Sequence, residues 1–128
     1  MKDVRMIILV RQDHRMRRSK LLSLITRASM KWIVDNNEDE HPARISLGMS
    51  MEEAQWFKEG QPKLFGWSSE NHLNDLALKA DFNGIPLSII RDDEEKSSIG
   101  SGQSITCIAF GPADYSDLTS VIGKFKSL

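Results

Sequence analysis

The stretch VRMIILVRQDHRMRRSKLL, residues 4–22, decides how the chain begins to fold. Its segment 4–10 is mostly apolar and rich in branched side chains, which predicts a central strand buried on both faces. Apolar residues then recur at helical spacing over 19–34, and Ser19 is the predicted N-cap of this helix. A buried strand that leads directly into an amphipathic helix is typical of an α/β sheet.

The rest of the chain continues this alternation of strands and helices. Ser50 and Glu53 match a capping box, which predicts a short helix from Met51 to about Glu59. A third helix is expected after Ser68 or Ser69, and a last helix is expected with Pro112 in its first turn. Further strands are predicted over 63–67, 85–90 and 104–110.

These elements predict one α/β domain over residues 1–128. Strands joined through helices place helices on both faces of the sheet. The short connection between the strands at 85–90 and 104–110 permits one antiparallel pairing. We therefore expect a mixed sheet of about four strands with helices on both faces.

The composition is that of an ordinary globular protein. The 128 residues have a net charge of −1, with 40% hydrophobic and 27% charged residues. No apolar run approaches the ~20 residues needed to span a membrane, and the first run is too short for a signal peptide. The single cysteine, Cys107, cannot form an internal disulfide, which favours a cytoplasmic location. The near-zero charge argues against a general nucleic-acid coat protein.

The segment Arg11–Lys20, RQDHRMRRSK, is a local exception to this balance. It carries five arginine or lysine residues and a single acid, Asp13. Several cations between a strand and a helix suit a phosphate-bearing partner at one edge of the fold. The other interpretation is a solvated surface loop, since charge runs are common where strands end.

The sequence contains no familiar cofactor or metal signature. The segment Gly100–Gly102 lacks the third glycine and the strand-to-helix context of a dinucleotide site. The three histidines are scattered, without acidic residues at ligand spacing, so no metal site is expected. Cys107 lies in a predicted core strand and is expected to be a buried apolar residue. Trp67 ends a strand and is the tryptophan best placed for base stacking, whereas Trp32 and Trp56 are expected in the core or at an interface.

Four segments, in order along the chain, resemble the type 2 peptidyl-tRNA hydrolase family. The family opens with an apolar strand and Arg-x-Asp-x-x-Met-x-x-Gly-Lys, which is similar to RQDHRMRRSK at 11–20. Its Gly-Gln-x-Lys resembles GQPK at 60–63, and its apolar strand from Gly to Asp resembles GIPLSIIRD at 84–92. Its last motif, with Gly-Pro-Ala-Asp, resembles residues 101–114. The resemblance covers nearly the whole chain.

This resemblance implies hydrolysis of the ester that joins a peptide to the 3′ end of tRNA, without a cofactor. By position, it implies a catalytic lysine at Lys20, an aspartate at Asp92 and an assisting hydroxyl at Ser104, where the family has a threonine. The lysine is suited to stabilising an oxyanion or holding a phosphate, and the aspartate to orienting or deprotonating a water. The residues expected to contact tRNA are Arg11, Arg15, Arg17, Arg18 and Lys63.

The chain also departs from the family pattern. Lys96 stands where the family has its nearer threonine, and the acids of segment 92–95 would repel phosphate. Two alternatives therefore stay open: a catalytically impaired tRNA- or RNA-binding module of the same fold, and a hydrolase for a small amide or ester. Proteins that resemble this chain often pair as dimers, and Trp56 and Phe57 are candidate contact residues. No membrane partner is expected.

Overall fold

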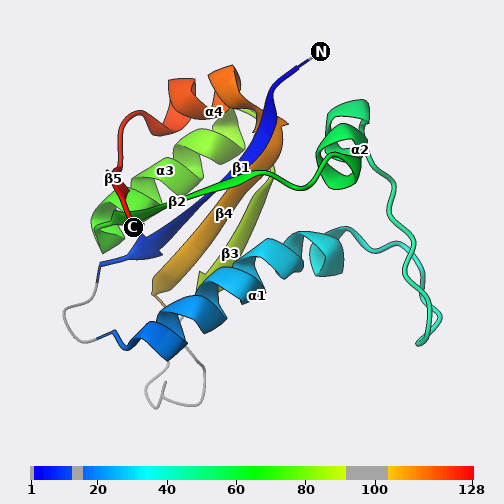
Figure 1. Cartoon of the computed structure of the whole chain (residues 1–128), viewed down its shortest axis with the longest axis horizontal. Helices are drawn as coiled ribbons and strands as arrows, with labels where there is room; N and C mark the ends of the chain where they lie inside the picture. The colour runs from blue at the N-terminus through cyan, green and yellow to red at the C-terminus, as the bar shows by residue number, and fades with distance from the viewer. Residues whose placement is uncertain (1, 13–15, 92–103) are drawn as a thin grey trace.

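The computed structural model describes residues 2–12, 16–91 and 104–128. These residues form one α/β domain, in which strands and helices alternate along most of the chain (Figure 1). The elements are β1 (Val4–Arg11), α1 (Arg18–Asn36), α2 (Met51–Lys58), β2 (Lys63–Ser68), α3 (Glu70–Phe82), β3 (Leu87–Arg91), β4 (Ile105–Asp114), α4 (Tyr115–Ile122) and β5 (Lys126–Ser127).

The sheet is mixed, as predicted, and has the strand order β3-β4-β1-β2-β5. Strand β1 pairs in parallel with β2 and antiparallel with β4. The expected antiparallel pairing between β3 and β4 is confirmed. Strand β5 was not predicted, because two residues are too few to show a periodic pattern.

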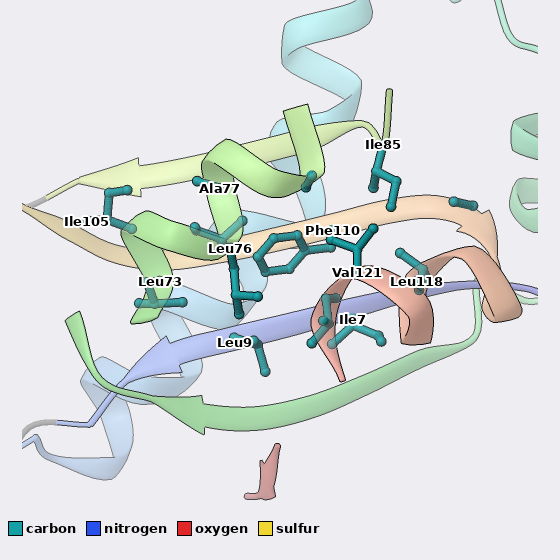
Figure 2. Close-up of a cluster of buried hydrophobic side chains, with 14 residues drawn as sticks. Ile7, Leu9, Leu73, Leu76, Ala77, Ile85, Ile105, Phe110, Leu118 and Val121 are labelled. Atoms are coloured by element: carbon teal, nitrogen blue, oxygen red, sulfur yellow. The ribbon is translucent and has the colours of Figure 1, made fainter. Parts of the chain in front are cut away.

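Helices cover both faces of the sheet, which confirms the predicted layers. On one face, α3 and α4 pack over a core that includes Ile7 and Leu9 of β1. Figure 2 shows Phe110 of β4 lying in this core, near the α3 and α4 side chains. On the other face, α1 and α2 pack over Met6 and Ile8 of β1. Successive residues of β1 therefore enter opposite cores, as the continuous apolar run predicts.

The capping residues of α2 and α3 are confirmed. The Ser50 hydroxyl accepts a hydrogen bond from the Glu53 backbone N–H at 3.1 Å, and the Glu53 carboxylate accepts from the Ser50 N–H at 2.8 Å. This is the predicted capping box. The Ser69 hydroxyl accepts from the His72 N–H at 3.2 Å and caps α3.

Two predicted helix starts are wrong. Helix α1 begins at Arg18 with Arg17 at its N-cap, so Ser19 lies inside the first turn and caps nothing. Pro112 lies in β4 rather than in a helix, because β4 remains paired with β1 as far as Asp114. Helix α4 starts only at Tyr115, and the Asp114 carboxylate accepts a hydrogen bond from the Ser116 N–H at 2.9 Å.

Candidate active site

Three strands point toward one edge of the sheet, and their carboxyl ends define the candidate site. Strands β1 and β2 run in parallel and end together, with Arg11 opposite Ser68. Strand β3 ends at the same edge with Arg91, which lies opposite Ile105 at the start of the antiparallel β4. The carboxyl edge of the strands is where open α/β sheets bind their ligands.

Helix α1 begins at this edge and presents unpaired cations there. Arg17, Arg18 and Lys20 are exposed, and their side chains form no ion pair or hydrogen bond with the described residues. The first turn of α1 contains no acidic residue. Cations at a helix N-terminus oppose the helix dipole, so an anion bound here would be favoured by both the dipole and the side chains.

Cations elsewhere in the described chain are often neutralised by acids. Lys2 pairs with Glu52 at 2.9 Å, and Lys31, also on α1, pairs with Asp35 at 2.8 Å. Arg5 and Arg44 also form ion pairs, with Asp3 at 2.9 Å and Asp39 at 3.1 Å. Arg17, Arg18 and Lys20 differ from these four cations in having no ion pair with the described residues, and they lie close together in the sequence at the start of α1.

Two of the three residues expected to be catalytic can be placed. Lys20 lies in the first turn of α1, and α1 packs on β3, β4 and β1. Ser104 is half-buried and directly precedes Ile105, the β4 residue that pairs with Arg91. Lys20 and Ser104 therefore both lie at the carboxyl edge. Asp92, Arg15 and Lys96 lie outside the described residues.

The structure does not bring Lys63 together with the other expected tRNA contacts. Lys63 lies opposite Met6 at the start of β2, five residues from the pair formed by Arg11 and Ser68. Five residues of a β-strand span about 16 Å, so Lys63 lies about 16 Å from the carboxyl edge. Its ammonium donates to the Gln61 carbonyl at 3.1 Å and lies 5.3 Å from the Trp56 ring centroid.

Cys107 is fully buried in β4. Burial raises the pKa of its thiol to about 12, although the charge of Arg27 opposes this shift. A thiol in that state is almost entirely protonated near neutral pH and is a poor nucleophile. The described part of the chain also brings no three His, Cys, Asp or Glu side chains together in a way that holds a metal ion.

The three tryptophans have different surroundings. Trp32 and Trp56 are buried and pack edge to face with ring centroids 5.6 Å apart. Trp56 is therefore not an exposed contact residue for a dimer, which corrects that expectation, whereas Phe57 is 37% exposed. Trp67 is half-buried at the carboxyl end of β2.

Strand β5 brings Lys126 to a position opposite Trp67, a neighbour that sequence reasoning missed. The only signal for it is the alternation of lysines around Phe125 near the end of the sequence.

Comparison with known proteins identifies the family. The sequence profile described as Peptidyl-tRNA hydrolase PTH2 matches residues 4–128, which include the whole sheet. The chain belongs to this family. A peptidyl-tRNA hydrolase of Saccharolobus islandicus is 28% identical over 131 residues, with 98% of this chain and 99% of that protein covered. The peptidyl-tRNA hydrolase of Haloquadratum walsbyi is 29% identical over 120 residues, covering 93% and 95%.

A solved structure shares the fold at lower sequence similarity. A protein of unknown function from Agrobacterium tumefaciens strain C58 superposes with a TM-score of 0.62 and 13% identity. The match covers 100% of this chain and 99% of that one.

No helix in the described residues is long and apolar enough to cross a bilayer.

Proposed function

We propose that this protein hydrolyses the ester bond of peptidyl-tRNA. The observation that carries the proposal is the family match, which extends over residues 4–128 and so includes the elements that form the carboxyl edge. The unpaired cations at the start of α1 agree with a polyanionic substrate. The relatives named peptidyl-tRNA hydrolase match over nearly their full length.

The proposed chemistry is attack of a water on the ester carbonyl. The Lys20 ammonium would stabilise the oxyanion that develops on the carbonyl oxygen, or would hold the neighbouring phosphate. Asp92 would orient the water or accept its proton, and the Ser104 hydroxyl would assist by hydrogen bonding. The bond that breaks joins the carbonyl carbon to the 3′ oxygen of the tRNA, which leaves with a proton.

The arginines would hold the tRNA backbone. Arg17 and Arg18 lie exposed at the carboxyl edge, and Arg11 ends β1 there. Arg15 belongs to the same basic segment of the sequence. Guanidinium groups bind phosphates through two parallel hydrogen bonds, so these residues would position the ester near Lys20. Lys63 would contact a different part of the tRNA.

The test is direct. Purified protein is incubated with tRNA carrying an N-acetylated amino acid, and release of the acetylated amino acid is measured. We expect turnover that Lys20→Ala lowers on the order of a hundredfold or more and that Lys31→Ala preserves, because Lys31 is paired with Asp35 farther along the same helix. Absence of turnover by the unmodified protein, with the substrate intact, would reject the hydrolase.

A non-catalytic tRNA-binding module is the second candidate, and Lys96 favours it. This lysine replaces a threonine of the family motif. If the replacement has impaired catalysis, the protein will bind tRNA without turnover, and Lys96→Thr will raise the rate. If turnover is already substantial and Lys96→Thr leaves it unchanged, the binding-module interpretation fails.

The proposed reaction also implies where the protein acts. Peptidyl-tRNA is made during translation, so we propose a cytoplasmic location, which fractionation of cells would test.

We also propose that the protein pairs as a homodimer through apolar residues such as Phe57, which is 37% exposed. Analytical ultracentrifugation of the protein and of Phe57→Ser would test this, and a monomeric mass for the unmodified protein would reject it.

A further inference from the structure

The helices cover the β2 side of the sheet less than the other strands. Helices α1 and α3 pack on β1, β3 and β4, whereas α2 and α4 pack on β1 and β4. Figure 1 shows β2 at the side of the sheet away from β3. Strand β2 is therefore less covered by helices than β1, β3 and β4, and its Phe65 side chain is 36% exposed.

Two aromatic rings project from β2 on the same face as α1. Trp67 packs at the border of the core beneath α1 and is half-buried. Phe65 is two residues earlier, so its side chain points to the same face, and it is 36% exposed. At the rise of a strand these two residues are about 7 Å apart along the strand. Gly66 between them faces the opposite side, where the Phe125 ring fills the space that a side chain would occupy.

Strand β5 adds positive charge beside these rings. Lys126 lies opposite Trp67 in the β2–β5 ladder, and residues directly opposite in a ladder point to the same face. Its side chain is exposed and forms no ion pair with the described residues. The Leu128 backbone N–H donates to the Phe65 carbonyl at 3.3 Å, which holds the end of the chain against β2. Neither β2 nor β5 contains an acidic residue.

This surface is continuous with the carboxyl edge. Trp67 lies opposite Val10, one position before the pair of Arg11 and Ser68 that ends both strands. Met16, just before Arg17, packs against the same core as Trp67. The two aromatic rings therefore form a row along β2 that starts at the carboxyl edge, where α1 begins with its unpaired cations.

We propose that Phe65, Trp67 and Lys126 form a stacking site for the single-stranded 3′ end of the tRNA. The proposal rests on the proposed function for the identity of the RNA. Every base has a flat face that stacks on an aromatic ring, and lysines beside the rings neutralise the phosphates between the bases. The absence of acids on both strands favours a nucleic acid over a basic protein partner. The terminal nucleotide would then reach Lys20, while the preceding bases stack on Trp67 and Phe65.

Tryptophan fluorescence offers a test that does not depend on catalysis. The protein is titrated with a four-nucleotide RNA ending in CCA. Because Trp32 and Trp56 are buried, quenching by stacked bases reports on Trp67. We expect saturable quenching, which Trp67→Leu removes. Phe65→Ala keeps this reporter and should weaken binding about 5- to 100-fold, the usual range for loss of one stacked base. Lys126→Ala should weaken binding and reduce its salt dependence.

Phe82→Ala is the matched control. Phe82 is 90% exposed on α3, away from β2, so its removal tests for nonspecific loss of an exposed aromatic ring. Circular dichroism of each variant reports whether the fold is intact. We expect Phe82→Ala to bind the RNA as the unmodified protein does. Equal binding by Phe65→Ala and the unmodified protein, or quenching that survives in Trp67→Leu, overturns the stacking site.

Kinetics separate this proposal from the proposed function. On N-acetylaminoacyl-tRNA, Phe65→Ala should raise KM with little change in kcat, because it removes binding that the ground state and transition state share. Normal hydrolysis with unaltered KM in this variant would reject the stacking site while leaving the hydrolase in place. Binding of the short RNA without any hydrolysis would reject the hydrolase and retain an RNA site on β2.

Discussion

The indole N–H of Trp32 on α1 donates a hydrogen bond to the carboxylate of Glu53 on α2, at 3.2 Å. The other oxygen of this carboxylate accepts from the Ser50 backbone N–H at 2.8 Å and completes the capping box. A buried indole N–H needs a partner, and Trp32 is only 1% exposed. The Glu53 side chain therefore completes the N-terminal cap of α2 and also accepts the hydrogen bond of Trp32, the largest fully buried side chain.

Glu53 variants should distinguish these roles through stability. Glu53→Leu removes both hydrogen bonds and leaves the indole N–H unpaired, so we expect a loss of about 1–3 kcal/mol. Glu53→Gln retains an acceptor oxygen and should cost less. Urea unfolding at neutral pH measures both, with Glu59→Leu at the exposed end of α2 as the control. Equal losses for Glu53→Leu and Glu59→Leu would show that the contact with Trp32 contributes nothing.

Substitution of the proposed catalytic residues Lys20 and Asp92 should slow turnover. Lys20→Ala and Asp92→Asn should each lower kcat/KM by a factor on the order of a hundred or more, as losses of charge stabilisation or proton transfer do. The losses should not multiply in the double variant if both groups act on one transition state. Ser104→Ala should cost less, because its hydroxyl only assists. Unchanged turnover in the Lys20 and Asp92 variants would exclude this site.

The exposed cations at the start of α1 should give tRNA binding a steep salt dependence. Each phosphate contact contributes close to one unit to the slope of log affinity against log salt. Replacing Arg17 and Arg18 with Ala should therefore flatten the slope by about two units. The control replaces Lys58 and Lys79, exposed cations in the last turns of α2 and α3, which changes the net charge equally. If the slope is the same in both double variants, Arg17 and Arg18 do not contact tRNA phosphates and belong to a solvated surface.

Gly66 should tolerate no side chain while Phe125 is present. A Cβ on Gly66 would lie 2.9 Å from the Lys126 carbonyl oxygen and would overlap the Phe125 ring. We expect Gly66→Ala to destabilise the protein by about 1–3 kcal/mol, as overpacking usually does. In a Phe125→Ala background the same change should cost less, because the ring is gone. Thermal unfolding of the four proteins closes this cycle, and equal costs in both backgrounds would contradict the contact.

Cys107 should react only when the protein opens. Burial raises the pKa of its thiol from 9.0 to about 12, so the native thiolate is about a thousandfold scarcer than in an unshifted thiol. Alkylation by iodoacetamide should therefore stay slow in the native protein as the pH rises from 7 to 10. In the urea-unfolded chain it should be fast, with a rate that is half-maximal near the ordinary thiol pKa of 9.0 and still rises at pH 10. Cys107→Ala should keep its hydrolase activity, and a large loss of kcat would make the thiol a participant.

Local chemistry explains which elements were predictable. The Ser50–Glu53 capping box needs only four consecutive residues, so it is visible in sequence and present in the structure. The start of α4 depends on a distant partner instead. Pro112 stays in a strand because β1 pairs with β4 beyond it, and no local pattern contains that information.

The sequence predicts where some candidate site residues lie along the fold, but not how they are arranged in space. The motif around Lys20 is contiguous in sequence, so its position at the start of α1 follows once the strand and helix are recognised. Lys63 looked equivalent to the arginines by charge alone. Only the register of β1 with β2 shows that it lies at the other end of the sheet. Likewise, no sequence pattern predicted that Lys126 pairs with Trp67.

The strand order also constrains how the protein is made. Strand β1 needs β4 as its neighbour, and their ladder joins Val4 to Asp114. Contacts this far apart in sequence close slowly, because the loop entropy is lost before the pairing is gained. A chain synthesised from its N-terminus therefore carries its most apolar strand with one side unpaired until β4 has left the ribosome. We expect nascent chains that end before β4 to be protease-sensitive and to bind chaperones, and the carboxyl edge to assemble only after synthesis of β4.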